Sequence, residues 1–315
     1  MLVSIVIPLF NEEESLPELV EWIDKVCTQD SLKYELILID DGSRDTSWSV
    51  ISELKAKYSN IRGIKFRRNY GKAAALHCGF EMSKGDVVIT MDADLQDSPE
   101  EIPGLVDMIM TENFDLVSGW KKKRYDPLGK RLPSKFFNWV ARRSSGIKIH
   151  DFNCGLKAYK KEVVKSIEVF GDMHRYIPLL AKRVGFSHIG EKVVQHQERK
   201  YGISKYGWSR LFSGALDLLT IGFITRFAKK PMHFFGSLGI LMMMLGFAVT
   251  AWLTGEKIHA VANHLEIREI TAQPLFYVAL VVLLIGVQFF LTGFLAELVS
   301  RSSTDRNNYL IEEKL

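Results

Sequence analysis

Apolar runs and amphipathic stretches alternate along the first 120 residues. Five runs rich in branched side chains predict buried strands: LVSIVIPLF (2–10), YELILIDD (34–41), IRGIKFRR (61–68), DVVITMDAD (86–94) and FDLVSGW (114–120). Between them, SLPELVEWIDKVC (15–27) and TSWSVISELKAKY (46–58) have the spacing of amphipathic helices. Strands that are apolar on both faces need helices above and below, so the pattern predicts an α/β domain with a mostly parallel, Rossmann-like sheet.

Two stretches near the carboxyl end contain no charged side chain. They are FFGSLGILMMMLGFAVTAWLTG (234–255) and PLFYVALVVLLIGVQFFLTGFLA (274–296). Each has about 22 residues, and about 20 apolar residues suffice to cross the core of a bilayer. A pair of buried core helices is the alternative, but such helices rarely avoid charge for so long. The pattern therefore predicts two transmembrane helices.

Basic residues around the two spans predict their orientation. The flanks carry Arg226, Lys229, Lys230, Arg301 and Arg306. The loop at 256–273 holds only two basic residues beside three glutamates. Because basic residues stay on the cytoplasmic side, we expect both termini in the cytoplasm, a short outward loop and localisation to the inner (cytoplasmic) membrane.

The segment before the first span, 207–230, places apolar and aromatic residues at helical spacing. Amphipathic helices in the membrane interface have this pattern, and so does one further core helix of a soluble domain. The predicted organisation is a cytoplasmic domain at 1–205, interfacial amphipathic helices at 206–231, two transmembrane helices at 232–300 and a cytoplasmic tail at 301–315.

Charge is unevenly distributed in a chain of ordinary composition, 47% hydrophobic and 25% charged. Between Lys121 and Lys148 there are ten basic residues and one acidic residue, Asp126. A solvated basic face and a nucleic-acid site both have this composition. In a chain with two spans, anionic lipid headgroups or a lipid phosphate are better partners, and no nucleic acid is expected. The three scattered cysteines suggest neither a disulfide framework nor a paired zinc site.

Carboxylates gather where two of the predicted strands end. Asp92 and Asp94 are separated by one residue, and Asp97 follows, so these side chains can converge as the strand turns. Mg²⁺ and Mn²⁺ take oxygen ligands and share them between carboxylates and substrate phosphates. Asp40 and Asp41 end the second predicted strand, and open α/β sheets bind ligands at such carboxyl ends. We therefore predict a divalent cation on Asp92 and Asp94 that holds a phosphorylated substrate.

Several common chemistries lack their motifs. There is no G-x-x-x-x-G-K-[ST] loop, and no G-x-G-x-x-G follows the first predicted strand. A P-loop NTPase or a dinucleotide-binding fold would therefore lack its phosphate cradle. G-x-S-x-G and H-E-x-x-H are also absent, which removes the commonest hydrolase signatures.

Six motifs in order resemble those of the polyprenyl-phosphate glycosyltransferases of glycosyltransferase family 2. They are SIVIPLFNEEESL, ILIDDGSRDTS, RNYGKAAAL, VITMDADLQDSPEEI, DFNCGLKAY and QERKYGISKY, followed by the two spans. The chain looks most like the bactoprenol (undecaprenyl-phosphate) glucosyltransferase group, with dolichyl-phosphate mannose synthase and the aminoarabinose transferase as relatives. The resemblance implies a GT-A fold, a nucleotide-sugar donor, a polyprenyl phosphate acceptor and assembly of homo-oligomers through the spans.

The resemblance also implies roles for individual residues. Those expected to bind the nucleotide sugar are Pro8, Phe10, Glu12, Asp40, Asp41, Asp92, Arg199, Ser204 and Lys205. Phe10 stands where the family usually has tyrosine, so a hydroxyl contact is lost while ring packing is kept. Asp92 and Asp94 match the metal site. The segment that contains Arg199 would close over the donor diphosphate, although its composition is also that of a flexible linker.

Three residues are expected near the reacting centre, and four at the acceptor. Asp94, Gln96 and Asp151 match family residues that bind the metal, orient the metal or diphosphate, and lie beside the reacting atoms. A simple turn residue is the alternative for Gln96. The residues expected to hold the acceptor phosphate are Arg124, Lys130, Arg131 and Ser134. Alignment leaves open which of Lys130 and Arg131 makes that contact.

The chemistry of the acceptor predicts the mechanism. A phosphate monoester has a second pKa of about 6, so it is largely ionised and nucleophilic at neutral pH. The site must instead neutralise two anions that approach one anomeric carbon, for which a metal and basic side chains suffice. We expect a single in-line displacement with inversion, in which Asp151 tunes geometry and forms no covalent intermediate.

The transferred sugar is the least determined feature. Resemblance to the bactoprenol group makes UDP-glucose the leading donor, although no identified side chain separates glucose from N-acetylglucosamine, galactose or mannose. A processive polysaccharide synthase is one alternative, but it normally adds a Gln-x-x-Arg-Trp motif and more spans. An inactive membrane scaffold that binds a nucleotide sugar is another.

Overall fold

The computed structural model describes residues 1–122, 138–143, 145–169, 173–198, 200–201, 231–266 and 268–302. The chain divides into two compact units, Met1–Ile221 and Gly222–Leu315. Nearly all of the predicted interfacial segment and most of the predicted tail lie outside the described residues. The bounds of the four predicted segments therefore stay predictions.

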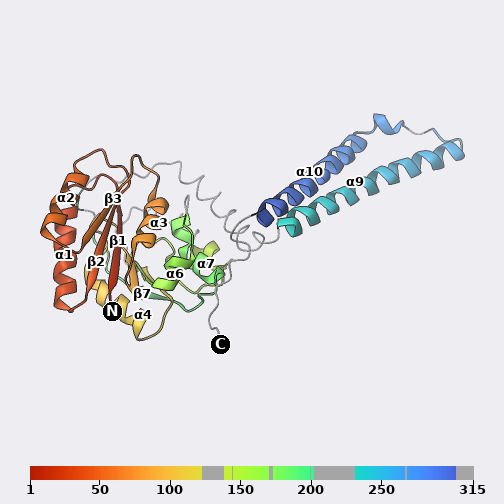
Figure 1. The fold of residues 1–315 in the computed structure, drawn as a ribbon. Coiled ribbons are helices and arrows are strands. Elements are labelled where there is room, and N and C mark those ends of the chain that lie inside the picture. Colours follow the sequence, from red (N-terminus) through yellow and green to blue (C-terminus); the bar gives the residue numbers. More distant parts are fainter. Residues whose placement is uncertain are drawn as a thin grey trace. The chain divides into compact units, whose positions relative to one another are not determined.

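A seven-stranded sheet forms the centre of the first unit (Figure 1). Its strands are β1 (Val3–Leu9), β2 (Tyr34–Asp40), β3 (Ile61–Lys65), β4 (Val87–Thr90), β5 (Leu116–Trp120), β6 (Lys157–Lys160) and β7 (Ile189–Val193). They are arranged in the order β3-β2-β1-β4-β6-β5-β7. All neighbours pair in parallel except β6, which runs antiparallel to both β4 and β5. The mostly parallel sheet predicted from the sequence is confirmed.

Helices cover both faces of the sheet because side chains alternate along each strand. One face carries α1 (Leu16–Gln29), α2 (Ser47–Lys57) and α4 (Ile102–Met110), preceded by η1 (Pro99–Glu101). The other carries α3 (Lys72–Met82), α6 (Lys161–Ser166) and α7 (Ile177–Arg183), preceded by η2 (Met173–Tyr176). In β1, Ile5 and Ile7 contact the first layer, whereas Val6 contacts the second. The result is a helix, sheet and helix sandwich.

The strand order places a ligand site between β1 and β4. From β1 the chain proceeds to β2 and β3 on one side, and it returns to β4 on the other side of β1. A crevice opens at the carboxyl ends of the strands where the order reverses in this way. The residues after Leu9 and after Thr90 therefore face the same space, as the sequence predicts.

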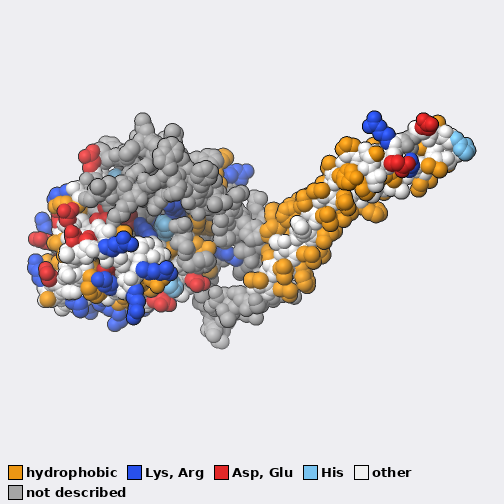
Figure 2. Space-filling model, turned by 90° about the horizontal axis from the view of Figure 1, so that it is seen from above, with side chains coloured by type: hydrophobic (Ala, Val, Ile, Leu, Met, Phe, Trp, Pro, Cys, Tyr) orange, Lys and Arg blue, Asp and Glu red, His pale blue; other side chains and the backbone are white. Residues whose placement is uncertain are grey.

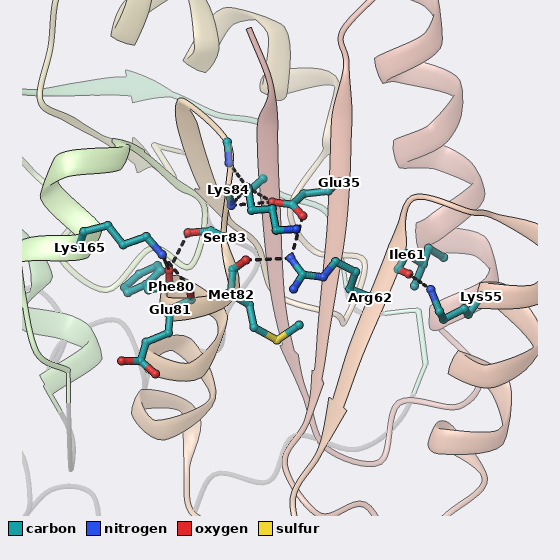
Figure 3. Close-up of polar contacts among 12 residues, drawn as sticks. Glu35, Lys55, Ile61, Arg62, Phe80, Glu81, Met82, Ser83, Lys84 and Lys165 are labelled. Carbon is teal, nitrogen blue, oxygen red and sulfur yellow. Dashed lines mark hydrogen bonds and ion pairs between the residues drawn. The ribbon is translucent and has the colours of Figure 1, made fainter.

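At the opposite end of these strands, Glu35 is 8% exposed and accepts three hydrogen bonds (Figure 3). Ser4 Oγ donates at 2.6 Å, the Lys84 N–H at 2.7 Å and Arg62 Nη1 at 3.1 Å. Arg62 Nη1 also donates to the Met82 carbonyl at the end of α3 (2.9 Å). Burial alone would raise the pKa of Glu35, but these hydrogen bonds outweigh it and lower the pKa.

Glu35→Gln is expected to destabilise the protein at neutral pH by about 1.5–3 kcal/mol, because a charge-assisted network loses its acceptor. Since the folded-state pKa of Glu35 is lowered, its stabilisation is complete above the unfolded value of about 4.3 and disappears as the pH falls through the folded value. The difference in Tm from wild type should therefore shrink on acidification. Glu21→Gln, on the exposed side of α1, is the control; an equal loss at pH 7 and pH 3 would contradict the electrostatic explanation.

The second unit contains a helical hairpin of α9 (Pro231–Ala262) and α10 (Pro274–Ser302), with η3 (Ile270–Ala272) in the connection. Glycines let the two helices approach closely. A Cβ on Gly239 would lie 2.7 Å from the Gly286 carbonyl oxygen, and one on Gly246 would lie 2.8 Å from that of Ala279. The inner face of the hairpin therefore depends on residues without side chains.

The outer surface of the hairpin is apolar along its length, and charges gather at its tip (Figure 2). There Lys257 pairs with Glu269 at 2.9 Å. Only 17% of the most apolar window of each helix is buried, whereas a core helix of a soluble protein is mostly buried. Both helices are long and apolar enough to cross a membrane, which agrees with the two predicted spans. Their orientation and any assembly through them stay predictions.

Candidate active site

The loops after β1 and β2 are joined by hydrogen bonds at the carboxyl edge of the sheet. The Asn11 N–H donates to Ser43 Oγ (2.9 Å), and the Arg44 N–H donates to Asn11 Oδ1 (2.8 Å). The Glu13 carboxylate accepts the Thr46 N–H at 2.7 Å. Asn11 has a φ of 53°, a left-handed conformation that asparagine tolerates better than most residues. These contacts fix one rim of the crevice.

Three predicted nucleotide-binding residues lie on this rim. Pro8 and Phe10 are half-buried at the end of β1. The Glu12 N–H donates to Ser47 Oγ at 3.0 Å, and Glu12 Oε2 accepts from Ser15 Oγ at 3.1 Å. Their position at the crevice agrees with the predicted role, which stays a prediction.

Asp40 and Asp41 have different surroundings although they are adjacent. Asp40 is fully buried; its Oδ1 accepts the Ser43 N–H (2.8 Å), while Oδ2 has no hydrogen-bond partner within the described part of the chain. Asp41 accepts the N–H groups of Tyr70 (2.7 Å) and Gly71 (2.9 Å). Asp41 therefore anchors the start of α3, a structural role that the sequence did not reveal. Burial raises the pKa of Asp41 despite these two bonds.

The start of α3 brings Lys72 against the predicted metal site. The Lys72 ammonium contacts Asp92 Oδ1 directly. A left-handed Gly71, with a φ of 94°, lets the chain enter the helix at this point. Burial alone would raise the pKa of Asp92, but Lys72, Lys121 and Lys157 outweigh it and lower the pKa. The surroundings of Asp92 therefore favour the carboxylate form that binds cations.

The residues around Asp92 fit a divalent cation shared with a substrate. Asp92 and Asp94 supply hard oxygen ligands, and the Lys72 ammonium already occupies a cationic position beside Asp92. No group of three metal-binding side chains occurs among the described residues. Two carboxylates leave coordination positions open, as expected where substrate phosphates complete the shell.

The chain after Asp94 is held by residues from distant segments. Gln96 Nε2 donates to the Gln197 carbonyl (3.4 Å), and the Gln197 N–H donates back to the Gln96 carbonyl (2.9 Å). Asp97 is fully buried, and its Oδ1 lies 2.6 Å from Lys121 Nζ at the end of β5. Asp97 is thus directed into the protein and does not join Asp92 and Asp94 in one acidic group.

The DFNCGLKAY segment packs directly against the metal site. A Cβ on Gly155 would lie 2.4 Å from Asp92 Oδ2, so any larger residue here would displace the Asp92 carboxylate. Asp151 is buried (1% exposed), and its Oδ1 accepts the Asn153 N–H at 3.1 Å. Its carbonyl accepts Ser118 Oγ at 3.0 Å, which ties it to β5. The structure therefore brings the 151–157 segment, distant in sequence, beside Asp92.

Seven predicted site residues lie outside the described residues. They are Arg124, Lys130, Arg131 and Ser134 of the acceptor set, and Arg199, Ser204 and Lys205 of the donor set. Their neighbours Lys200 and Tyr201 are described and contact Glu18 of α1, at 2.7 and 3.2 Å.

Sequence reasoning missed the cations around Asp92, namely Lys72, Lys121 and Lys157. Lys72 and Lys157 lie within motifs that the resemblance uses, but nothing in those motifs assigns them a role. The sequence does not reveal that such a lysine is buried: Lys157 is only 3% exposed, although it lies in the polar-looking KAYK of β6.

Comparisons with known proteins agree with this geometry. Residues 4–168 match the family model "Glycosyl transferase family 2". The chain belongs to glycosyltransferase family 2. It is 38% identical over 302 residues to dodecaprenyl-phosphate galacturonate synthase of Rhizobium johnstonii, covering 95% of this chain and 88% of the relative. It is 42% identical over 250 residues to undecaprenyl-phosphate 4-deoxy-4-formamido-L-arabinose transferase of Pseudomonas fluorescens, covering 78% and 72%. The resemblance to polyprenyl-phosphate glycosyltransferases is confirmed, and the chain is a glycosyltransferase.

Solved structures show the same fold. Glucosyl-3-phosphoglycerate synthase from Mycobacterium tuberculosis, in a complex with Mn²⁺ and UDP, superimposes with a TM-score of 0.54 at 22% identity, covering 71% of this chain and 79% of that one. Mannosyl-3-phosphoglycerate synthase from Rubrobacter xylanophilus gives a TM-score of 0.57 at 15% identity, covering 71% and 74%. The GT-A fold predicted from the sequence is thereby confirmed.

Proposed function

We propose that this glycosyltransferase moves a sugar from a nucleotide-sugar donor, a UDP-sugar, to a polyprenyl phosphate at the membrane, with Mg²⁺ or Mn²⁺ bound by Asp92 and Asp94. The observation that carries the proposal is the convergence of Asp92, Lys72 and the 151–157 segment where the strand order reverses, in a chain with a lipid-compatible hairpin. The names of the two relatives, both polyprenyl-phosphate sugar transferases, support it.

The relatives' names do not support glucose as the transferred sugar. One acts on galacturonate and the other on 4-deoxy-4-formamido-L-arabinose. We therefore replace UDP-glucose, the donor expected from the bactoprenol group, with a donor that carries a sugar of one of these two kinds.

The residues suggest how the chain promotes the displacement. Asp92 and Asp94 would hold the divalent cation, which would neutralise charge on the leaving diphosphate. Lys72 adds a fixed positive charge beside Asp92, where it can stabilise negative charge on the donor. Asp151 is held by its two hydrogen-bonded neighbours and positions the reacting groups. Because the acceptor phosphate is already ionised, this arrangement needs no strong base, and we propose inversion in one step.

Removing divalent metal is expected to abolish transfer. The test uses the purified full chain in detergent, undecaprenyl phosphate and a panel of labelled UDP-sugars, with and without EDTA. Metal-dependent labelling of the lipid by one donor would support the proposal and identify the sugar. Labelling that persists in EDTA would contradict the metal assignment, and nucleotide binding without labelling from any donor would favour the scaffold alternative.

A further inference from the structure

A small recess lies beside Asp92, between α3, η2 and the strands β4 and β6. Three of the side chains that line it are cationic, Lys72, Lys157 and Arg175, and none of its described lining residues is a carboxylate. Thr90, Tyr159 and His174 add polar atoms to its wall. The recess is therefore a positively charged space next to the predicted reacting centre.

Lys157 is the strongest indication that the recess takes an anion. Its side chain is buried, and its ammonium contacts the Cys154 carbonyl. Within the part of the chain that the structure describes, no carboxylate lies within ion-pair distance of Lys157. By contrast, the largely buried Lys121 side chain (12% exposed) pairs with Asp97, and Lys160, three residues along the same chain, pairs with Asp115 at 3.1 Å. Burial lowers the pKa of Lys157, and Asp151 and Asp92, which attract the ammonium from beyond ion-pair distance, do not outweigh this effect. A buried ammonium without a direct ion-pair partner is costly unless a ligand supplies one.

His174 adds a second unsatisfied group. Its Nδ1 is buried and has no hydrogen-bond partner among the described residues. Burial, with Lys72, Arg175 and Lys157 nearby, lowers the pKa of His174 well below its usual value, so the imidazole is neutral. A neutral imidazole has one donor and one acceptor nitrogen, and can therefore bond a carboxylate or hydroxyl oxygen.

We infer that the recess binds the carboxylate of the transferred sugar, so that the donor is a nucleotide-linked uronic acid. The recess has room for about one water molecule, so it cannot hold a sugar ring or a diphosphate. A single oxygen of a planar carboxylate can enter it. This inference rests on the proposed function, because it places the sugar of the donor beside Asp92.

The inference distinguishes between the sugars in the relatives' names. Galacturonate carries a carboxylate that is ionised at neutral pH, whereas the formamido group of the arabinose derivative is uncharged. The positive charges of Lys157 and Arg175 complement the carboxylate of galacturonate, but they attract an uncharged formamido group only weakly. A neutral hexose such as galactose would leave the Lys157 ammonium without a direct ion-pair partner.

The test compares the binding of three ligands to the purified full chain in detergent: UDP-galacturonate, UDP-galactose and UDP. Wild type is expected to bind UDP-galacturonate roughly 10- to 100-fold more tightly than UDP-galactose, as a buried charge pair implies. Lys157→Met should remove this preference, because its affinity for UDP-galacturonate should fall at least tenfold more than its affinity for UDP or UDP-galactose. Lys157→Arg should retain part of it. Lys160→Met, on the same strand and outside the recess, is the matched control.

Two results would overturn the inference. If Lys157→Met weakened the binding of all three ligands equally, the Lys157 ammonium would be shown to bind the diphosphate and not a sugar carboxylate. Equal affinity of wild type for both sugars would exclude a carboxylate site. The Tm of unliganded Lys157→Met should not fall, because methionine replaces a buried charge that has no direct ion-pair partner, and this separates lost recognition from misfolding. Absence of lipid labelling from every donor, with the binding preference intact, would refute the proposed transfer reaction and not the recess.

Discussion

Asp94→Asn is expected to lower the rate of sugar transfer by about a thousandfold. Asparagine has the same shape but no negative charge, so it is a poorer ligand for a hard cation. The loss of one such electrostatic contribution typically costs 10² to 10³ in kcat, at about 1.4 kcal/mol for each factor of ten. The fold should be kept, because Asp94 is half-exposed and an asparagine oxygen can still accept the Gln96 N–H.

The measurement combines transfer rates with donor binding. For wild type, Mn²⁺ should strengthen the binding of UDP; for Asp94→Asn, UDP should bind with the same affinity with or without Mn²⁺. Asp107→Asn, an exposed carboxylate of α4, should behave like wild type in both assays. Metal-enhanced binding that survives in Asp94→Asn would show that the cation is held elsewhere.

The periodicity of the sequence predicted the fold because the central strands are long and apolar. All five strands predicted from apolar runs are present, and both spans coincide with helices of the hairpin. The pattern did not predict β6 and β7. β6 has four residues with lysine at both ends, and β7 lies at the sheet edge with half-exposed side chains. Neither gives a run of apolar residues, so only pairing with neighbouring strands defines them.

The sequence predicted the part of the candidate site in which carboxylates follow strands. It did not predict the part in which the direction and contacts of a side chain depend on its burial. Asp92 and Asp94 could be placed from the sequence because parallel strands end at one edge. The sequence alone could not separate Asp97 from them, since its inward direction depends on Lys121 at the end of β5. Nor could it show that Asp41 anchors α3 through the N–H groups of Tyr70 and Gly71.

The ion pair of Asp97 and Lys121 fixes the loop that follows the metal carboxylates. Asp97 is fully buried, and the Lys121 side chain is 12% exposed. Burial alone would lower the pKa of Lys121, but the negative charge of Asp97 outweighs this effect and raises the pKa. A buried pair of this kind contributes little net stability compared with apolar residues, but removing one partner leaves an uncompensated charge. The pair should therefore matter more for position than for stability.

Asp97→Asn is expected to destabilise the protein by about 3–5 kcal/mol, because the Lys121 ammonium loses its counter-ion inside the domain. For a domain of this size, such a loss lowers Tm by about 10 °C. Transfer should fall as well, because the displaced loop carries Asp94 and Gln96. Tryptophan fluorescence of the detergent-solubilised chain follows unfolding, and Asp107→Asn again serves as the control.

The double variant Asp97→Leu with Lys121→Met separates stability from position. Two apolar side chains of suitable volume can replace a buried ion pair without loss of stability, so Tm should return close to the wild-type value. Transfer should stay about tenfold or more below wild type, because apolar contact does not fix the direction of the loop, and small displacements of reacting groups are costly. If Tm and the transfer rate both returned to wild-type values, the ion pair would serve only to stabilise the fold. If Tm alone returned, the ion pair would be shown to position the metal carboxylates.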